Sequence, residues 1–218
     1  MRLTLLKAAL LIVPLAACSG GDREPERTSA VEPEAPVTSA AEPVVPQEPE
    51  SPSAAQTATD ALTADGWENL RIGMTREEIA ALYGPDANPS AAGGADPAQC
   101  EQYRPESAPE GMLLMLVDGR LARISLIRES AIETAAGVGV GAEAAAVKSV
   151  YGAKAQASPH KYEGAPAEYV TIWETDRSGE AYVTDEAARG VRYVIGGDGK
   201  VQSIHAGGPA IQYVEGCA

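Results

Sequence analysis

The chain has 218 residues, and its 31 acidic and 17 basic side chains give it a formal net charge of −14 at pH 7. A chain this acidic is repelled by nucleic acid and by anionic lipid head groups, so its composition argues against nucleic-acid binding. No segment beyond the N-terminus reaches 18 consecutive apolar residues, so the sequence predicts no transmembrane helix.

The N-terminal stretch MRLTLLKAALLIVPLAAC has a basic start, followed by a run of ten residues from Ala8 to Ala17 that is too short to span a membrane. A helix needs about 20 apolar residues to cross the hydrocarbon core of a bilayer. A basic start, a short apolar run and small residues before a cleavage point are typical of a secretory signal. The sequence therefore predicts a signal peptide at residues 1–17.

The end of this stretch, Leu15-Ala16-Ala17-Cys18, resembles the lipobox of bacterial lipoproteins, which is cleaved before its cysteine. The resemblance implies that Cys18 carries a diacylglycerol and an N-terminal acyl chain such as palmitate, and two acyl chains already anchor stably. Lipoproteins kept at the inner membrane tend to have Asp next, whereas this chain has Ser19. The expected location is the outer membrane, facing the periplasm or exposed at the cell surface. The alternative is an ordinary secreted protein with a chance cysteine.

Residues 18–60 contain seven prolines, seven glutamates and no aromatic residue. Such a segment buries too little apolar surface to offset its chain entropy, so it is expected to stay disordered. Its composition favours extended polyproline conformations. The segment is therefore expected to tether one folded domain, residues 61–218, to the membrane.

The first predicted helix lies in IGMTREEIAALYG, residues 72–84. Thr75 and Glu78 occupy the two positions of a capping box, and a Gly-Pro pair ends the helix. The apolar residues expected to share one face at helical spacing are Ile79, Leu82 and Tyr83.

A similar phrase, VGAEAAAVKSVYG, begins at Val140, which is 68 residues after Ile72, and predicts a second helix. Each helix is followed by apolar runs that flank an Asp-Gly pair, at Asp118-Gly119 and at Asp198-Gly199. Asp-Gly between apolar runs is the strongest short signal for a β-hairpin. The second unit adds a predicted strand at Glu168–Trp173.

The sequence thus predicts an α+β domain built from two repeats, about 65–132 and about 133–210. An isolated two-stranded hairpin is only marginally stable, so the two units are expected to share one antiparallel sheet. Both helices are expected to cover one face of this sheet. The other face is expected to be open to water or to a partner.

The pattern I-G-M-T-x-x-E-I-x-x-L-Y-G-P at residues 72–85 is similar to the signature of the small outer-membrane assembly lipoproteins of the small protein A (SmpA/OmlA) type. Tandem copies of such a unit resemble the β-lactamase inhibitor protein fold. The resemblance covers about residues 65–207. It implies a helical layer on an antiparallel sheet, no catalysis, and binding to proteins through the sheet.

Cys100 and Cys217 are the two cysteines beyond Cys18. In the oxidising compartment that an export signal implies, such a pair is expected to form a disulfide. A redox or metal-binding pair would need a C-x-x-C motif or a histidine cluster, and the sequence has neither. Closing a loop of more than 100 residues contributes roughly 4–5 kcal/mol in the chain-entropy model.

No motif predicts catalysis, a metal or a cofactor. His160 and His205 are far apart in sequence and lack the spacing of zinc ligands. The chain has no G-x-S-x-G motif of a serine nucleophile and no P-loop. We therefore predict no catalytic residue, no metal site and no cofactor.

The aromatic residues are eight Tyr, two Trp and no Phe, so every aromatic ring carries a polar group. This composition suits partly wet surfaces and interfaces. One interpretation is that they pack inside a small sheet protein. The other is that several bind a protein or glycan on an exposed face; these are Tyr103, Tyr162, Tyr169, Trp173, Tyr182 and Tyr193.

The expected function is that of a non-enzymatic, outer-membrane-anchored periplasmic lipoprotein. Its expected partner is another envelope protein, which it would help to assemble or would inhibit. The alternative is a lipoprotein that binds peptidoglycan or another glycan on Tyr and Trp platforms. A hydrolase of unrecognised type is a third hypothesis.

Overall fold

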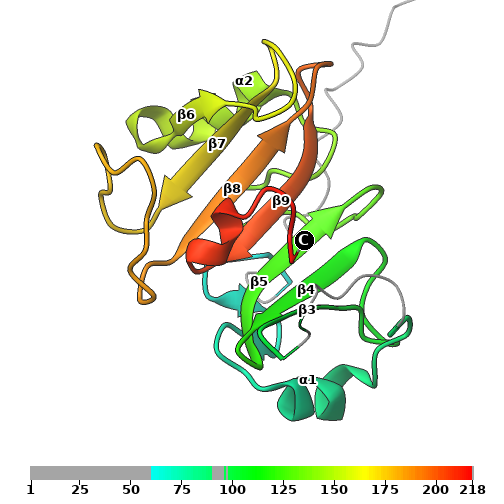
Figure 1. The fold of residues 1–218 in the computed structure, drawn as a ribbon. Helices are drawn as coiled ribbons and strands as arrows, with labels where there is room; N and C mark the ends of the chain where they lie inside the picture. The colour runs from blue at the N-terminus through cyan, green and yellow to red at the C-terminus, as the bar shows by residue number, and fades with distance from the viewer. Residues whose placement is uncertain (1–59, 90–95, 97, 218) are drawn as a thin grey trace, which may run out of the picture. The chain divides into compact units, whose positions relative to one another are not determined.

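The computed structural model describes residues 60–89, 96 and 98–217 (Figure 1). The predicted signal peptide, the predicted lipidation site Cys18 and nearly all of the predicted linker lie outside the described residues. None of the helices in the described part is long and apolar enough to cross a membrane.

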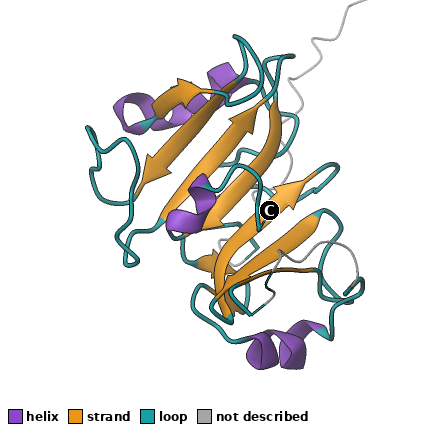
Figure 2. Ribbon diagram, viewed as in Figure 1, coloured by secondary structure: helices purple, strands orange, loops and turns teal. Residues whose placement is uncertain are grey.

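The described residues form strands, two short α-helices and two 3₁₀ turns (Figure 2). In chain order the elements are β1 (Gly66–Trp67), β2 (Leu70–Arg71), α1 (Arg76–Tyr83), β3 (Cys100–Tyr103), β4 (Met112–Val117), β5 (Arg120–Ile127), α2 (Ala144–Tyr151), η1 (Gly152–Lys154), β6 (Gln156–Pro159), β7 (Glu168–Trp173), β8 (Gly190–Ile195), β9 (Val201–Gly207) and η2 (Pro209–Gln212).

Seven strands form one antiparallel sheet in the order β3-β4-β5-β9-β8-β7-β6, and β1 and β2 form a separate two-stranded sheet. The β5–β9 pair joins the earlier strands to the later ones. A mostly antiparallel sheet with two short helices agrees with the predicted α+β class, and β7 has the bounds of the strand predicted from the sequence.

The helix α1 begins as its capping box predicts. The Thr75 side chain accepts from the Glu78 backbone, and the Glu78 carboxylate accepts from the Thr75 N–H at 2.8 Å. Ile79 is fully buried, whereas Leu82, expected on the same face, is 45% exposed. Ile79 is therefore the one residue of this short helix that is buried. The helix α2 has no side-chain cap at Glu143.

Both Asp-Gly pairs lie in hairpin connections, but the two turns differ. Asp118 and Gly119 both have positive φ, 49° and 71°, and link β4 directly to β5. Two successive positive φ values are typical of the tight type I′ turn. The second connection runs over residues 196–200, because the last pair of the β8–β9 ladder is Ile195 with Val201.

One face of the sheet carries the main core. Both helices pack on this side, because Ile79 of α1 and Val147 of α2 belong to the same buried cluster. Alternate residues of a strand point to opposite faces, so a row across the central strands shows which side each faces. The fully buried row on the helix side is Leu126, Ile204, Tyr193 and Val170.

The expectation that the other face is open is wrong. Residues 209–217, which we call the strap, cross this face, and η2 lies over β8 and β9 in Figure 1. The strap ends at a disulfide between Cys217 and Cys100 of β3, with Cα atoms 5.4 Å apart, which confirms the predicted pairing. The row that faces the strap is polar and consists of Ser125, His205, Arg192 and Thr171.

A test of the shared core compares two substitutions in α1. Ile79→Ala should lower the free energy of unfolding by about 2–5 kcal/mol, because it opens a cavity under a fully buried side chain. Leu82→Ala, in the same helix but exposed, should change it by about 0.5 kcal/mol or less. The measurement is urea unfolding followed by fluorescence of single-tryptophan variants that retain either Trp67 or Trp173. The two signals should shift together in Ile79→Ala; a shift confined to Trp67 would show that the sheet has no shared core.

Candidate functional site

Two arginines on the sheet hold the strap. Arg123 of β5 donates from Nη1 to the carbonyl oxygens of Ala210 and Tyr213, at 3.2 and 2.9 Å. Arg192 of β8 donates from Nη1 to the carbonyl oxygen of Gln212 at 3.1 Å. A buried charge is costly unless it is hydrogen-bonded, so strap and arginines stabilise one another.

Neither arginine has a carboxylate partner in the part of the chain that the structure describes. No ion pair among the described residues involves Arg123 or Arg192. Arg123 is only 4% exposed, and burial, with the nearby charge of Arg192, lowers its pKa to about 10. The Arg192 guanidinium also lies 4.3 Å from the centre of the Tyr169 ring, within reach of a cation–π interaction. This face of an acidic protein is therefore locally basic.

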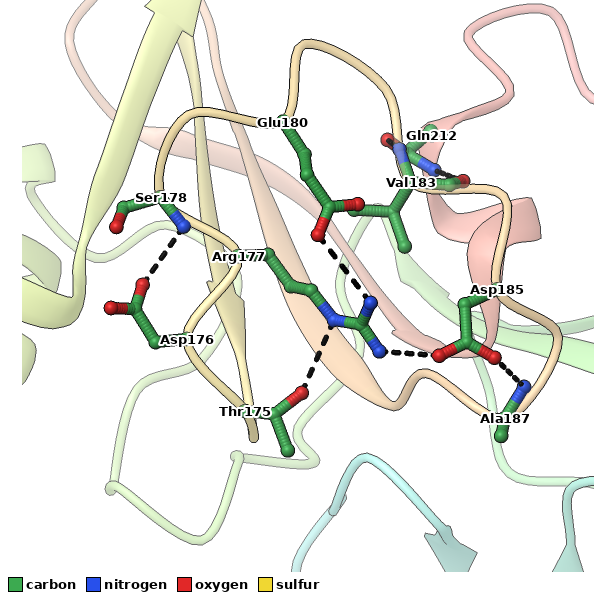
Figure 3. A network of polar contacts seen from close by, with 9 residues as sticks. All are labelled: Thr175, Asp176, Arg177, Ser178, Glu180, Val183, Asp185, Ala187 and Gln212. Carbon is green, nitrogen blue, oxygen red and sulfur yellow. Dashed lines mark hydrogen bonds and ion pairs between the residues drawn. The ribbon is translucent and has the colours of Figure 1, made fainter.

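A second, smaller core joins the strap to the loop of residues 174–189. Its members are Trp173, Val183, Ala188 and Ile211. The Gln212 side chain accepts from the Val183 N–H at 3.0 Å and donates to the Val183 carbonyl at 2.8 Å (Figure 3). Loop and strap therefore form one layer over this face.

The loop is also fixed by its own charges. Figure 3 shows Arg177 between Glu180 and Asp185, with nitrogen–oxygen distances of 3.4 and 2.5 Å. Arg177 Nε also donates to the Thr175 hydroxyl at 3.2 Å. The hydrogen bond from Arg177 lowers the pKa of the Asp185 carboxyl. The contacts of the Arg177 guanidinium group therefore hold this acidic loop in a defined turn.

A groove of about 380 Å³ lies where the loop, the strap and the β4–β5 hairpin meet. Tyr182 of the loop and Tyr213 of the strap line it and are 52% and 38% exposed. Arg120 and Arg189 also line it, and each donates to backbone carbonyls, Arg120 to Gly73 at 2.9 Å. We call this the tyrosine groove. It presents exposed rings, guanidinium groups and backbone in one concave surface.

The six aromatic residues predicted to bind a partner fall into three places. Tyr162 and Tyr182 are exposed, but only Tyr182 lines the tyrosine groove. Tyr169 and Trp173 are buried on the strap side. Tyr103 and Tyr193 are fully buried and belong to the main core. For these two residues the prediction of a position on an exposed face is wrong.

The buried tyrosines satisfy their hydroxyl groups internally. The Tyr103 hydroxyl donates to the Gly84 carbonyl at 2.5 Å, and the Tyr193 hydroxyl lies 2.9 Å from Thr134 Oγ1 and 2.8 Å from the Tyr151 hydroxyl. The presence of a hydroxyl group therefore does not by itself indicate that a tyrosine ring is exposed. Tyr213, which sequence reasoning did not single out, follows η2 and carries no local signal for a groove.

Ser125 and His205 form a pair that the sequence did not reveal. Ser125 Oγ lies 2.9 Å from His205 Nδ1, and no hydrogen bond among the described residues joins His205 to a carboxylate. Ser125 is 1% exposed under the strap, so a substrate cannot reach its hydroxyl in this structure. The pair acts here as a buried polar contact between β5 and β9. Among the described residues no group of three or more His, Cys, Asp or Glu side chains is arranged to hold a metal.

Comparisons with known proteins add little to this geometry. No protein-family model matches the chain, and no curated protein matches it. Among solved structures, the chain is similar to a DUF4309 family protein, YjgB, from Bacillus subtilis, with 14% sequence identity and a TM-score of 0.40. That match covers 69% of this chain and 89% of the other. At this level the similarity defines neither a fold family nor a function.

The buried histidine predicts a pH dependence of stability. Burial, and then the charges of Arg123 and Arg192, hold the pKa of His205 well below its ordinary value of 6.5. As pH falls below about 6.5, the unfolded chain binds a proton on His205 that the folded chain does not bind. The free energy of unfolding should therefore fall as pH drops from about 7.5 to about 5.5, as measured by urea unfolding.

The variant His205→Gln should flatten this dependence, because it removes the titrating group. Equal slopes in wild type and His205→Gln would contradict this prediction.

Proposed function

We propose that this protein is a non-enzymatic, lipid-anchored envelope protein that binds another protein through the tyrosine groove. The observation that carries the proposal is the pairing of Tyr182 and Tyr213 with Arg120 and Arg189 around one concave surface. Tyrosine and arginine are the residue types most enriched at the energetic centres of protein interfaces. The groove is also formed by elements that the small core and the strap hold in place, which limits the ordering cost of binding.

The net charge of the protein limits which protein surfaces can bind in the groove. The whole chain carries a formal charge of −14, whereas the groove brings two arginines together with two acidic residues, Asp118 and Glu186. A basic or neutral protein surface is attracted or tolerated by such a molecule, while an acidic one is repelled. The proposed occupant is therefore an exposed segment of an envelope protein with an apolar or aromatic side chain and no excess negative charge.

The proposed location rests on the N-terminal sequence and on the disulfide. A signal peptide at 1–17, acylation of Cys18 and Ser19 after it would place the protein at the outer membrane. The Cys100–Cys217 disulfide agrees with an oxidising compartment such as the periplasm. The Pro-Glu segment up to residue 60 would then act as the tether.

We also infer that the sheet is made of two related units, in line with the resemblance to the small protein A type and the inhibitor fold. The strand order supports this inference. On one side of the central β5–β9 pair the chain neighbours lie in the order β4, β3, and on the other side in the order β8, β7, so each half is a run of strands adjacent in sequence. Each half also contributes one helix with a single fully buried residue, Ile79 or Val147. Whether the protein assists assembly or inhibits an enzyme depends on which partner binds.

A glycan such as peptidoglycan is the second candidate ligand. The groove combines two aromatic rings with polar side chains such as Asp118 and Thr184, which suits a sugar ring as well as a peptide. Its arginines favour the protein partner. The same experiment separates the two.

The test places a photo-crosslinking amino acid at position 182 in cells that express the lipidated protein. Exposed Val150 of α2, which does not line the groove, is the matched control position. Position 182 should give a discrete protein adduct, and the Tyr213→Ser and Arg120→Ser variants should reduce it at least severalfold. An equal adduct from position 150, or an adduct insensitive to both variants, would contradict a groove-bound protein. An adduct only to peptidoglycan fragments would favour the glycan.

The same cells test the anchor through the Cys18→Ala variant. Loss of acylation should move the protein out of the membrane fraction. If Cys18→Ala still sediments with the outer membrane after a salt wash, the lipid-anchor part of the proposal is wrong.

A further inference from the structure

A smaller, partly open cavity of about 100 Å³ lies between the sheet and the strap. Its lining includes the strand residues Tyr169, Arg192, Ser203 and His205, together with His160, which follows β6. We call it the strap cavity. One water molecule occupies about 30 Å³ in the liquid, so the cavity has the volume of about three waters or one compact polyatomic ion. No carboxylate lines it.

Two of the lining groups have their acceptor atoms already occupied. His160 Nδ1 accepts the backbone N–H groups of Tyr162 and Glu163, at 3.3 and 3.1 Å. The neutral His160 ring must therefore carry its proton on Nε2, which makes that atom a donor. The Tyr169 hydroxyl accepts the N–H of Lys161 at 3.2 Å, so its own hydrogen remains to be donated.

The charge around the cavity is positive and unpaired. Arg192 uses Nε for Thr171 and Nη1 for the strap, and its Nη2 makes no hydrogen bond to a described residue. Arg123 lies next to this cluster, and its Nε is buried without a hydrogen-bond partner. The carboxylates directly next to cavity residues in the sequence are paired elsewhere, Glu168 with Lys148 and Glu215 with Lys161.

We propose that the strap cavity binds one compact oxyanion, of the size of inorganic phosphate or a small carboxylate, between Arg192, the Ser203 and Tyr169 hydroxyls and the His160 and His205 rings. The anion offsets the charge of the partly buried Arg192, which lines the cavity, and of the buried Arg123 nearby; neither forms an ion pair with a carboxylate among the described residues. It also accepts from the Tyr169 hydroxyl and from His160 Nε2, whose hydrogens are not used in any hydrogen bond among the described residues. Burial first, and then the charges of Arg123 and Arg192, lower the pKa of His205, so the positive charge beside the cavity also acts on this ring.

This site is independent of the tyrosine groove, although Tyr213 borders both. Apart from Tyr213, different strap residues line the two sites, Pro209 and Ala210 in the groove and Ile211 and Val214 in the cavity. The anion proposal can therefore fail while the groove proposal stands, and the reverse also holds.

The test is thermal unfolding of the disulfide-bonded protein in sodium phosphate or sodium acetate, with sodium chloride keeping the ionic strength constant. At least one oxyanion should raise Tm saturably, because a ligand that binds only the folded state stabilises it. The two salts distinguish a phosphate from a carboxylate ligand. Arg192→Gln should abolish the rise and Ser203→Ala should weaken apparent affinity severalfold, while Lys154→Gln, an exposed loss of the same charge, should leave it unchanged.

Nuclear magnetic resonance of the two histidines gives a second readout that does not depend on the Arg192 variant folding. Saturating phosphate or acetate should shift the His205 ring signals and raise the pKa of this ring, since an anion favours its protonated form. His160→Gln assigns the two sets of signals. A Tm rise equal in chloride alone, a rise that survives both Arg192→Gln and Ser203→Ala, or no change in the His205 signals would overturn the proposal.

Discussion

The hydrogen bonds from Arg123 and Arg192 to the strap carbonyls are the contacts on which the strap side depends. Two guanidinium groups on the strap face of the sheet are costly to bury without hydrogen-bond partners. The carbonyl groups of a chain segment laid across that face also need donors. The guanidinium groups and the strap carbonyls satisfy one another's hydrogen bonds. The Cys100–Cys217 disulfide fixes the far end of the strap. The sheet thus becomes covered on both faces, with an apolar core beneath the helices and a polar, cationic layer beneath the strap.

This arrangement moves the candidate binding surface from the sheet to the layer above it. Because Ile211 of the strap packs with Trp173 and Val183, the loop of residues 174–189 is held against the strap. Tyr182 and Tyr213 come from these two segments and meet at one groove. The proposed protein-binding groove and the proposed anion site therefore share the strap: Pro209 and Ala210 line the groove, Ile211 and Val214 line the cavity, and Tyr213 borders both. Both depend on the strap staying in place.

Local patterns predicted much of the fold, because their physical causes are local. A capping box places the start of α1 at Thr75, and an Asp-Gly pair turns β4 into β5 at Asp118. The strap was not predictable in this way. Arg123 and Arg192 alternate with apolar neighbours and look like solvent-facing strand residues, while the carbonyls that Arg123 bonds lie 87 and 90 residues away. The aromatic residues show the same limit, since the Tyr193 hydroxyl is satisfied by Thr134, 59 residues earlier.

The most direct test of this account is hydrogen–deuterium exchange of the strap in an Arg123→Met variant with its disulfide intact. Methionine keeps an apolar stem under the strap but removes both hydrogen bonds to Ala210 and Tyr213. The account predicts that the amides of Ile211 and Tyr213 exchange faster, while Val170 and Ile204 in the main core keep their protection. Unchanged protection of the strap would contradict the claim that the arginines hold it on the sheet.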